Sequence, residues 1–119
     1  MRAGALLAAA AALLAADEVP AGVVVRAGRL LADRCITCHG PERADGGIRL
    51  DRPLDLALVV TPRRPDSSHL IRLVTLGAGD ALLMPPATAG PRLDAWEVEL
   101  LRQWILLGAD PFPAAPASR

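Results

Sequence analysis

Five consecutive residues, Cys35-Ile36-Thr37-Cys38-His39, contain both cysteines of the chain and one of its two histidines. Two thiols at this spacing, followed at once by an imidazole, form the C-x-x-C-H signature of covalent haem attachment. Each thiol can add to one vinyl group of the same porphyrin, and His39 can then reach the iron from that side. The pattern predicts one haem c, attached through Cys35 and Cys38.

Two other uses of these residues are open in the sequence alone. A C-x-x-C pair can be a dithiol redox centre, although that use favours a βαβ context that the sequence does not show. A Cys2His2 zinc site would combine the two thiols and His39 with His69. The adjacency of Cys38 and His39 is awkward for tetrahedral coordination, so haem attachment is the preferred interpretation.

The sixth position of the iron, opposite His39, decides what such a protein does. A protein ligand there favours electron transfer, whereas an open position favours ligand binding or catalysis. Met84, in Leu83-Met84-Pro85-Pro86, is the main candidate, because a thioether is a soft ligand and a His/Met pair raises the reduction potential. The two prolines stiffen its loop. His69 is the rival, since bis-histidine ligation is also common.

Charge excludes one class of partner. The chain has thirteen arginines, no lysine and thirteen acidic residues, and its formal net charge is zero. Without a basic run or a net positive charge, nothing argues for nucleic-acid binding.

The first 21 residues resemble an export signal. Arg2 supplies a positive charge, and an uninterrupted apolar stretch follows over residues 3–16. This stretch is shorter than the ~20 residues that span a bilayer. We therefore expect a signal peptide cleaved after Ala16 or Ala21; an uncleaved membrane anchor is the alternative. Export agrees with the haem motif, because this attachment takes place outside the cytoplasm, and it predicts a periplasmic protein.

One all-α domain, residues 22–110, is expected to position these groups. Its first helix runs from Val25 to Cys35, with an apolar face that includes Leu31. Gly28 on that face indicates close approach of another helix, with a glycine that only marks the helix start as the alternative. A second helix is expected over 67–76, with an N-cap at Asp66 or Ser67 and a stop at Gly77.

The C-terminal helix has the clearest local signals. Asp94 is the predicted N-cap, and Glu97 three residues later completes a capping box. Gly108 is expected to end the helix. An apolar stripe, expected to pack against the first helix, consists of Val98, Leu101, Trp104 and Ile105. Long loops join the helices, with a turn at Gly46-Gly47, and residues 111–119 form a flexible Pro/Ala tail.

Taken together, these motifs resemble the planctomycete-type cytochrome c domain, a family within the class I cytochromes c. The resemblance extends from about Arg29 to Ala109. After the haem motif it depends on four ordered elements: Gly46-Gly47-Ile48-Arg49-Leu50-Asp51, Pro65-Asp66-Ser67-Ser68-His69-Leu70, Met84-Pro85-Pro86 and the segment from Leu100 to Ala109.

The resemblance implies a class I cytochrome c fold, with three to four helices and long loops wrapped around one haem. It implies that Cys35 and Cys38 are the thioether residues, His39 the proximal ligand and Met84 the distal ligand. Arg49 falls at the family's arginine position and would bind a haem propionate, with a solvated loop arginine as the alternative.

The predicted function is that of an exported monohaem c-type cytochrome, a monomer and not an enzyme, that carries single electrons between periplasmic redox proteins. One alternative is a haem-based sensor or enzyme with a labile sixth position. Another is the redox module of a larger assembly. Partner contact is expected around the Met84 loop, at Leu82, Leu83, Pro85 and Pro86, with core burial as the alternative for the leucines.

Overall fold

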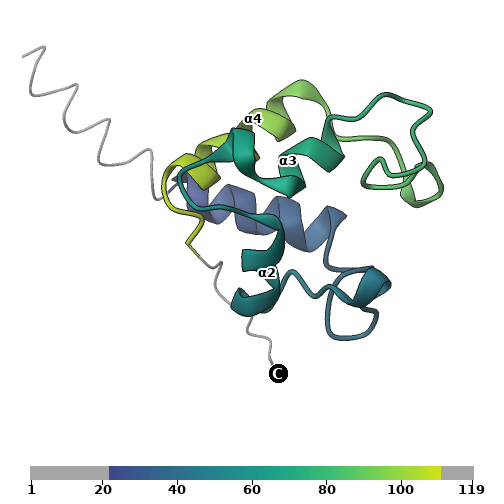
Figure 1. The fold of residues 1–119 in the computed structure, drawn as a ribbon, viewed down its shortest axis with the longest axis horizontal. Coiled ribbons are helices and arrows are strands. Elements are labelled where there is room, and N and C mark those ends of the chain that lie inside the picture. The colour runs from purple at the N-terminus through teal and green to yellow at the C-terminus, as the bar shows by residue number, and fades with distance from the viewer. Residues whose placement is uncertain (1–21, 111–119) are drawn as a thin grey trace, which may run out of the picture.

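The computed structural model describes residues 22–110 and contains four α-helices within that range (Figure 1). The first, here helix 22–34, is followed by α2 (Pro53–Val59), α3 (His69–Val74) and α4 (Ala95–Leu106). Three short 3-10 helices lie at Asp45–Gly47, Pro65–Ser67 and Ala87–Ala89. The described range has no strand, only an isolated bridge between His39 and Ala44. The predicted all-α class is confirmed.

The predicted signal peptide and C-terminal tail lie outside the described residues. Both proposed cleavage positions, after Ala16 and after Ala21, lie outside them too.

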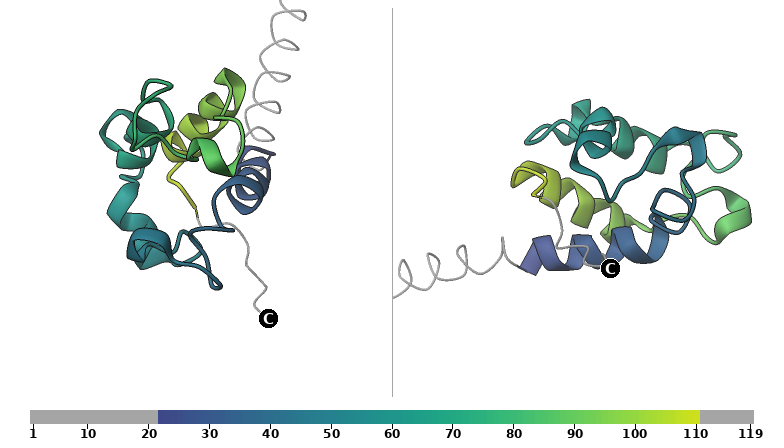
Figure 2. Two further views of the ribbon diagram at one scale, coloured as in Figure 1. Left: turned by 90° about the vertical axis from the view of Figure 1, so that its right-hand side faces the viewer. Right: turned by 90° about the horizontal axis from the view of Figure 1, so that it is seen from below.

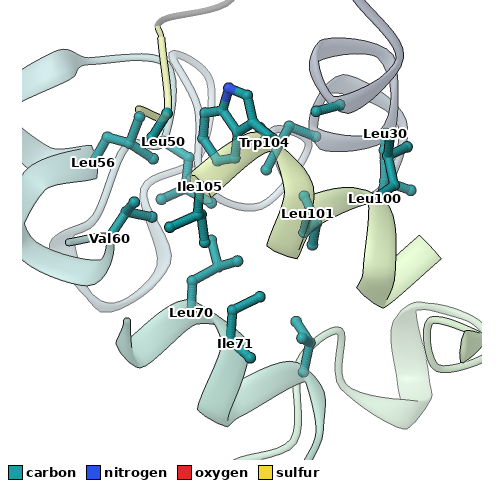
Figure 3. Packing of buried hydrophobic residues seen from close by; sticks show 14 of the residues in the cluster. Leu30, Leu50, Leu56, Val60, Leu70, Ile71, Leu100, Leu101, Trp104 and Ile105 are labelled. Atoms are coloured by element: carbon teal, nitrogen blue, oxygen red, sulfur yellow. The ribbon is translucent and has the colours of Figure 1, made fainter. Parts of the chain in front are cut away.

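α4 lies between two neighbours. It packs against α3 on one side, and helix 22–34 runs along its other side in both views of Figure 2. Buried side chains from all three helices meet there. Four of them are 0% exposed: Leu31, Leu101, Trp104 and Ile105. Figure 3 shows Leu30 beside Leu100 on the helix 22–34 side and Leu70 and Ile71 of α3 facing Ile105. The predicted contact between first and last helices is confirmed, and Gly28 is buried.

α4 begins and ends where local signals place it. The side chain of Asp94 accepts a hydrogen bond from the Glu97 amide at 3.0 Å, and Glu97 accepts one from the Asp94 amide at 2.9 Å. At the other end, Gly108 has a φ of 111°. Its amide donates to Ile105, and that of Ala109 donates to Trp104, which is the Schellman pattern. Both predicted caps are confirmed.

α3 is shorter than predicted, and its predicted N-cap was wrong. Pro65–Ser67 form a 3-10 turn, so Ser68 is the N-cap residue. The hydroxyl of Ser68 caps nothing; it accepts from the Thr61 amide and donates to the Arg64 carbonyl. α3 ends at Val74, before Gly77, and the Thr75 hydroxyl that follows donates to the carbonyls of Ile71 and Arg72.

α2 was not predicted from sequence. Pro53 occupies its first turn, where a missing amide is tolerated. Only Leu56 of its residues is buried, so its seven residues give too little helical periodicity to recognise. The helix also explains why Leu58 and Val59, which have strand-like composition, pair with no strand.

Candidate functional site

A cavity of about 400 Å³ lies between the C-x-x-C-H segment and the loop that carries Met84. Six separate stretches of the chain contribute to its walls: 34–39, 45–50, 58–59, 69–74, 84–89 and residue 101. The lining is mainly apolar and includes Ile48, Leu50, Leu58, Val59, Leu70, Leu73, Val74, Pro85, Pro86, Ala89 and Leu101. The remaining lining residues are Arg34, Cys35, Cys38, His39, Asp45, His69 and Met84, so the candidate thiols, imidazoles and thioether all lie around one cavity.

The C-x-x-C-H segment continues directly from helix 22–34. The Cys35 amide donates to Leu31 at 2.9 Å, and the His39 amide donates to Cys35 at 2.9 Å. These turns bring both thiols and the imidazole to one wall, which is the arrangement that the spacing predicts. Both cysteines are free.

His39 is oriented by a contact that the sequence did not reveal. Its Nδ1 lies 3.2 Å from the carbonyl oxygen of Ile48. When Nδ1 donates in this contact, Nε2 keeps its lone pair for a metal, the usual arrangement around a ligating histidine. The Gly46-Gly47 turn makes the contact by folding residues 44–50 back onto the motif, where the Leu50 amide also donates to His39 at 2.8 Å.

Gly40, directly after His39, fixes the path of the motif. It is buried, and a Cβ at this position would collide with the carbonyl oxygen and side chain of Ile36. Its amide donates to Arg43 at 2.7 Å. The turn that presents His39 therefore requires a residue without a side chain.

Met84 and His69, the two candidates for the sixth position, both line the cavity. Met84 is partly buried, between the buried Leu83 and Pro85, and its amide donates to Leu73 at 3.1 Å. His69 is the first residue of α3 and is exposed. The geometry thus brings both side chains to the site.

The other two uses of the cysteines have little physical support. Burial raises the pKa of the Cys35 thiol to about 11, an effect larger than the opposing one of Arg34. Redox-active cysteines instead have a depressed pKa. Within residues 22–110, no group of three or more His, Cys, Asp and Glu side chains is placed to share a metal ion.

Arg49 and Arg34 differ in their relation to the cavity. Arg49 is not among the lining residues; its guanidinium binds the carboxylate of Asp51, with contacts of 2.5 and 3.0 Å. That hydrogen bonding holds the pKa of Asp51 below its ordinary value. Arg34 does line the cavity and was missed from sequence, although it directly precedes Cys35. It donates to the Pro91 carbonyl and lies 3.7 Å from Glu97.

The predicted contact residues around Met84 divide into two kinds. Leu83 and Pro85 are buried, so core packing is the role of that leucine. Leu82 is 63% exposed, and Pro86 is exposed. Elsewhere around the cavity, Leu58 is 68% exposed although it also lines the wall.

In the part of the chain that the structure describes, no helix has the length and apolar character needed to cross a membrane.

Comparison with known proteins gives one match. Residues 35–88 match a family model described as Planctomycete cytochrome C. The matched range starts at Cys35 and includes His39, Arg49, His69 and Met84. No curated protein and no solved structure matches the chain.

Proposed function

We propose that residues 35–88, which match the family model described as Planctomycete cytochrome C, form a haem-binding domain that carries electrons. On this basis we propose that the protein is an exported monohaem cytochrome that transfers single electrons between periplasmic redox proteins. One observation carries the proposal: a single, mainly apolar cavity has Cys35, Cys38 and His39 in its walls together with Met84.

The residues present fit one haem c. Cys35 and Cys38 supply the two free thiols that thioether attachment needs. His39, oriented by Ile48, supplies an imidazole nitrogen for the iron. The apolar walls suit the faces of a porphyrin, and the Met84 thioether is a soft ligand for iron.

When bound, the haem supplies reversible one-electron exchange at its iron. The chain's own residues set the conditions for that exchange. A Met84 sulfur in the sixth position would exclude water and small ligands, and a His/Met pair favours a higher potential than bis-histidine ligation. Electron exchange of this kind needs no acid or base from the protein, so we propose a carrier and not an enzyme.

Arg49 stays in the proposal as a propionate partner. It lies between Ile48 and Leu50, both of which line the cavity, and its amide donates to Asp55 at 2.9 Å. To bind a propionate, its guanidinium would share or exchange its present partner, Asp51. The alternative role, a loop arginine paired only with Asp51, would leave the reduction potential of Arg49→Gln unchanged.

We propose that redox partners approach two exposed leucines, one in the cavity wall and one in the loop that carries Met84. Leu58 and Leu82 are 68% and 63% exposed, and Leu58 lies in the cavity wall. Contacts between redox proteins are small and brief, so one exposed leucine in the cavity wall and another two residues before Met84 suit a monomer that binds and releases its partners. Leu82→Glu should slow electron transfer without changing the spectrum or the stability.

The first test is covalent attachment. The protein purified from the periplasm should keep its haem through acid-organic extraction, and its mass should exceed that of the polypeptide by one haem. Cys35→Ala or Cys38→Ala should lose most holoprotein, whereas Thr37→Ala, which changes an exposed residue of the same motif, should keep it. A folded, colourless protein containing zinc would overturn the proposal.

The second test is the sixth ligand. The oxidised protein should be low-spin, with the weak long-wavelength sulfur-to-iron band. Met84→Ala should abolish that band, lower the potential and admit cyanide or carbon monoxide, whereas His69→Ala should leave the spectrum unchanged. The opposite pattern would assign the ligand to His69. Ready binding of carbon monoxide by the wild type would favour a sensor or enzyme with an open sixth position.

A further inference from the structure

Met84 lies near the middle of a long connection, residues 75–94, that leaves the end of α3 and returns to the start of α4. In Figure 1 this connection is the green loop that extends beyond the two helices. Its only helical segment is the 3-10 turn Ala87–Ala89. The position of the Met84 side chain therefore depends on how the loop is fastened to the helices.

The C-terminal end of α3 fastens the loop through its free carbonyls. The last four carbonyls of an α-helix have no partner within the helix. Thr75 serves two of them, donating through its hydroxyl to Ile71 at 2.7 Å and to Arg72 at 3.2 Å. The Leu73 carbonyl accepts from the amide of Met84 at 3.1 Å.

Arg92 serves the last of the four. Its Nη2 donates to the Val74 carbonyl at 3.2 Å and to the Leu76 carbonyl, just beyond the helix, at 2.8 Å. A cation at a helix C-terminus is also favoured by the dipole of the helix. The return limb of the loop is thus tied back to its starting point, one residue from the carbonyl that holds Met84.

We infer that Arg92 is a positioning residue for Met84. By closing the loop onto the end of α3, its guanidinium keeps the Met84 amide on Leu73 and the side chain at the cavity. Hydrogen bonds from a charged donor are stronger than neutral ones. Here one nitrogen of Arg92 joins the loop to Val74, 18 positions earlier in the chain. The inference rests on the proposed role of Met84 as the distal ligand.

The experiment compares Arg92→Ala with Arg102→Ala in the holoprotein. Arg102 is a matched control, because it pairs with Asp66 and Glu99 and with no residue of the loop. In Arg92→Ala, hydrogen exchange at the Met84 amide should be about tenfold faster, the order expected for loss of charge-assisted hydrogen bonds, while the α4 amides keep their protection. Cyanide should bind the oxidised form faster by a similar factor, and Arg92→Lys should recover part of both effects.

The outcomes separate this inference from the proposed function. If Met84→Ala leaves the spectrum unchanged, the ligand assignment fails, and exchange at the Met84 amide alone decides the role of Arg92. If Met84→Ala changes the spectrum but Arg92→Ala matches Arg102→Ala in exchange and in cyanide binding, the inference is overturned. Should Arg92→Ala fail to yield holoprotein, Arg92→Gln replaces it, and wild-type exchange at Met84 in that variant overturns the inference.

Discussion

Ser68 connects the segment after α2 to the start of α3 through a single hydroxyl. It is only 3% exposed and is the buried polar residue of the described range. Its hydroxyl oxygen accepts from the Thr61 amide at 2.9 Å, and its O–H group donates to the Arg64 carbonyl at 2.8 Å. Removing one partner of a buried hydrogen bond leaves the other unsatisfied, which is costlier than losing the bond alone.

We therefore expect Ser68→Ala to lower the free energy of unfolding by roughly 1–3 kcal/mol. Ser67→Ala, at the exposed neighbouring position, should have little effect. Urea unfolding of the two holoproteins, followed by circular dichroism, measures the difference. Equal midpoints for both variants would mean that the Ser68 hydroxyl is replaceable by water.

The ion pair of Asp51 and Arg49 makes stability depend on pH. The pKa of Asp51 lies below its ordinary value of 3.8, mainly because the Arg49 guanidinium donates to the carboxylate. The unfolded chain then binds a proton at a higher pH than the folded chain does. The contribution of the pair is complete above pH 3.8 and is lost as the pH falls through the lower pKa of the folded state.

Accordingly, Asp51→Asn should unfold more easily than the wild type at neutral pH, and the gap should narrow as the solution is acidified below about pH 4. Denaturant midpoints measured across the acid range test this. A gap that stays constant with pH would assign the effect of the substitution to packing and not to charge.

At the scale of elements, the N-cap of α4 can be tested by single substitutions. Asp94→Ala removes the side chain that accepts from the Glu97 amide and should cost about 1 kcal/mol. Asp94→Asn, which keeps an acceptor, should cost less. Glu99→Gln, on an exposed position of the same helix, is the control for surface charge. Thermal unfolding should rank these variants in that order, and equal values for Ala and Asn would contradict a capping role.

How well an element could be predicted depended on where its determinants lie. α4 carries both of its caps in its own sequence, so its bounds were predictable. α2 and the start of α3 depend on more distant contacts: Arg49 donates its amide to Asp55 of α2, and Ser68 bonds to Thr61 instead of capping its own helix. Local sequence patterns do not reveal such hydrogen bonds between distant residues.

The site shows the same division. The cysteines, His39 and Met84 could be proposed from sequence because their chemistry is specific to their residue types and spacing, and all four line the cavity. Ile48, Arg34 and Arg92 were not, since each acts through contacts with distant residues: a backbone carbonyl aimed at His39, or a guanidinium bound to distant carbonyls. Any residue has a carbonyl and many arginines are exposed, so neither feature has a sequence signature.

At the scale of the whole molecule, the cavity is lined by residues from all four helices. Its volume is about 400 Å³, and leucines and valines from α2, α3 and α4 line it. Domains of this size bury too little surface to be more than marginally stable by themselves. The bound haem should therefore act as part of the core.

We expect the double variant Cys35→Ala/Cys38→Ala, purified without haem, to melt at least about 10 °C below the holoprotein. In a domain of this size 1 kcal/mol corresponds to about 4–8 °C. Calorimetry or circular dichroism measures the shift, and the double variant should also lose near-ultraviolet signal from its tryptophans. A haem-free protein that melts with the holoprotein would show that the α4 core is sufficient alone.

Gly40 has a consequence for transplanting this site. Because a Cβ there would strike the backbone of Ile36, the five residues that carry the haem chemistry cannot be grafted onto another scaffold as an independent cassette. The transplant needs a sixth residue with no side chain, so that the chain can pass close to Ile36. Among random single substitutions near the motif, those at position 40 should thus be eliminated for their bulk, whatever their charge or polarity, while the exposed Thr37 accepts wide variety.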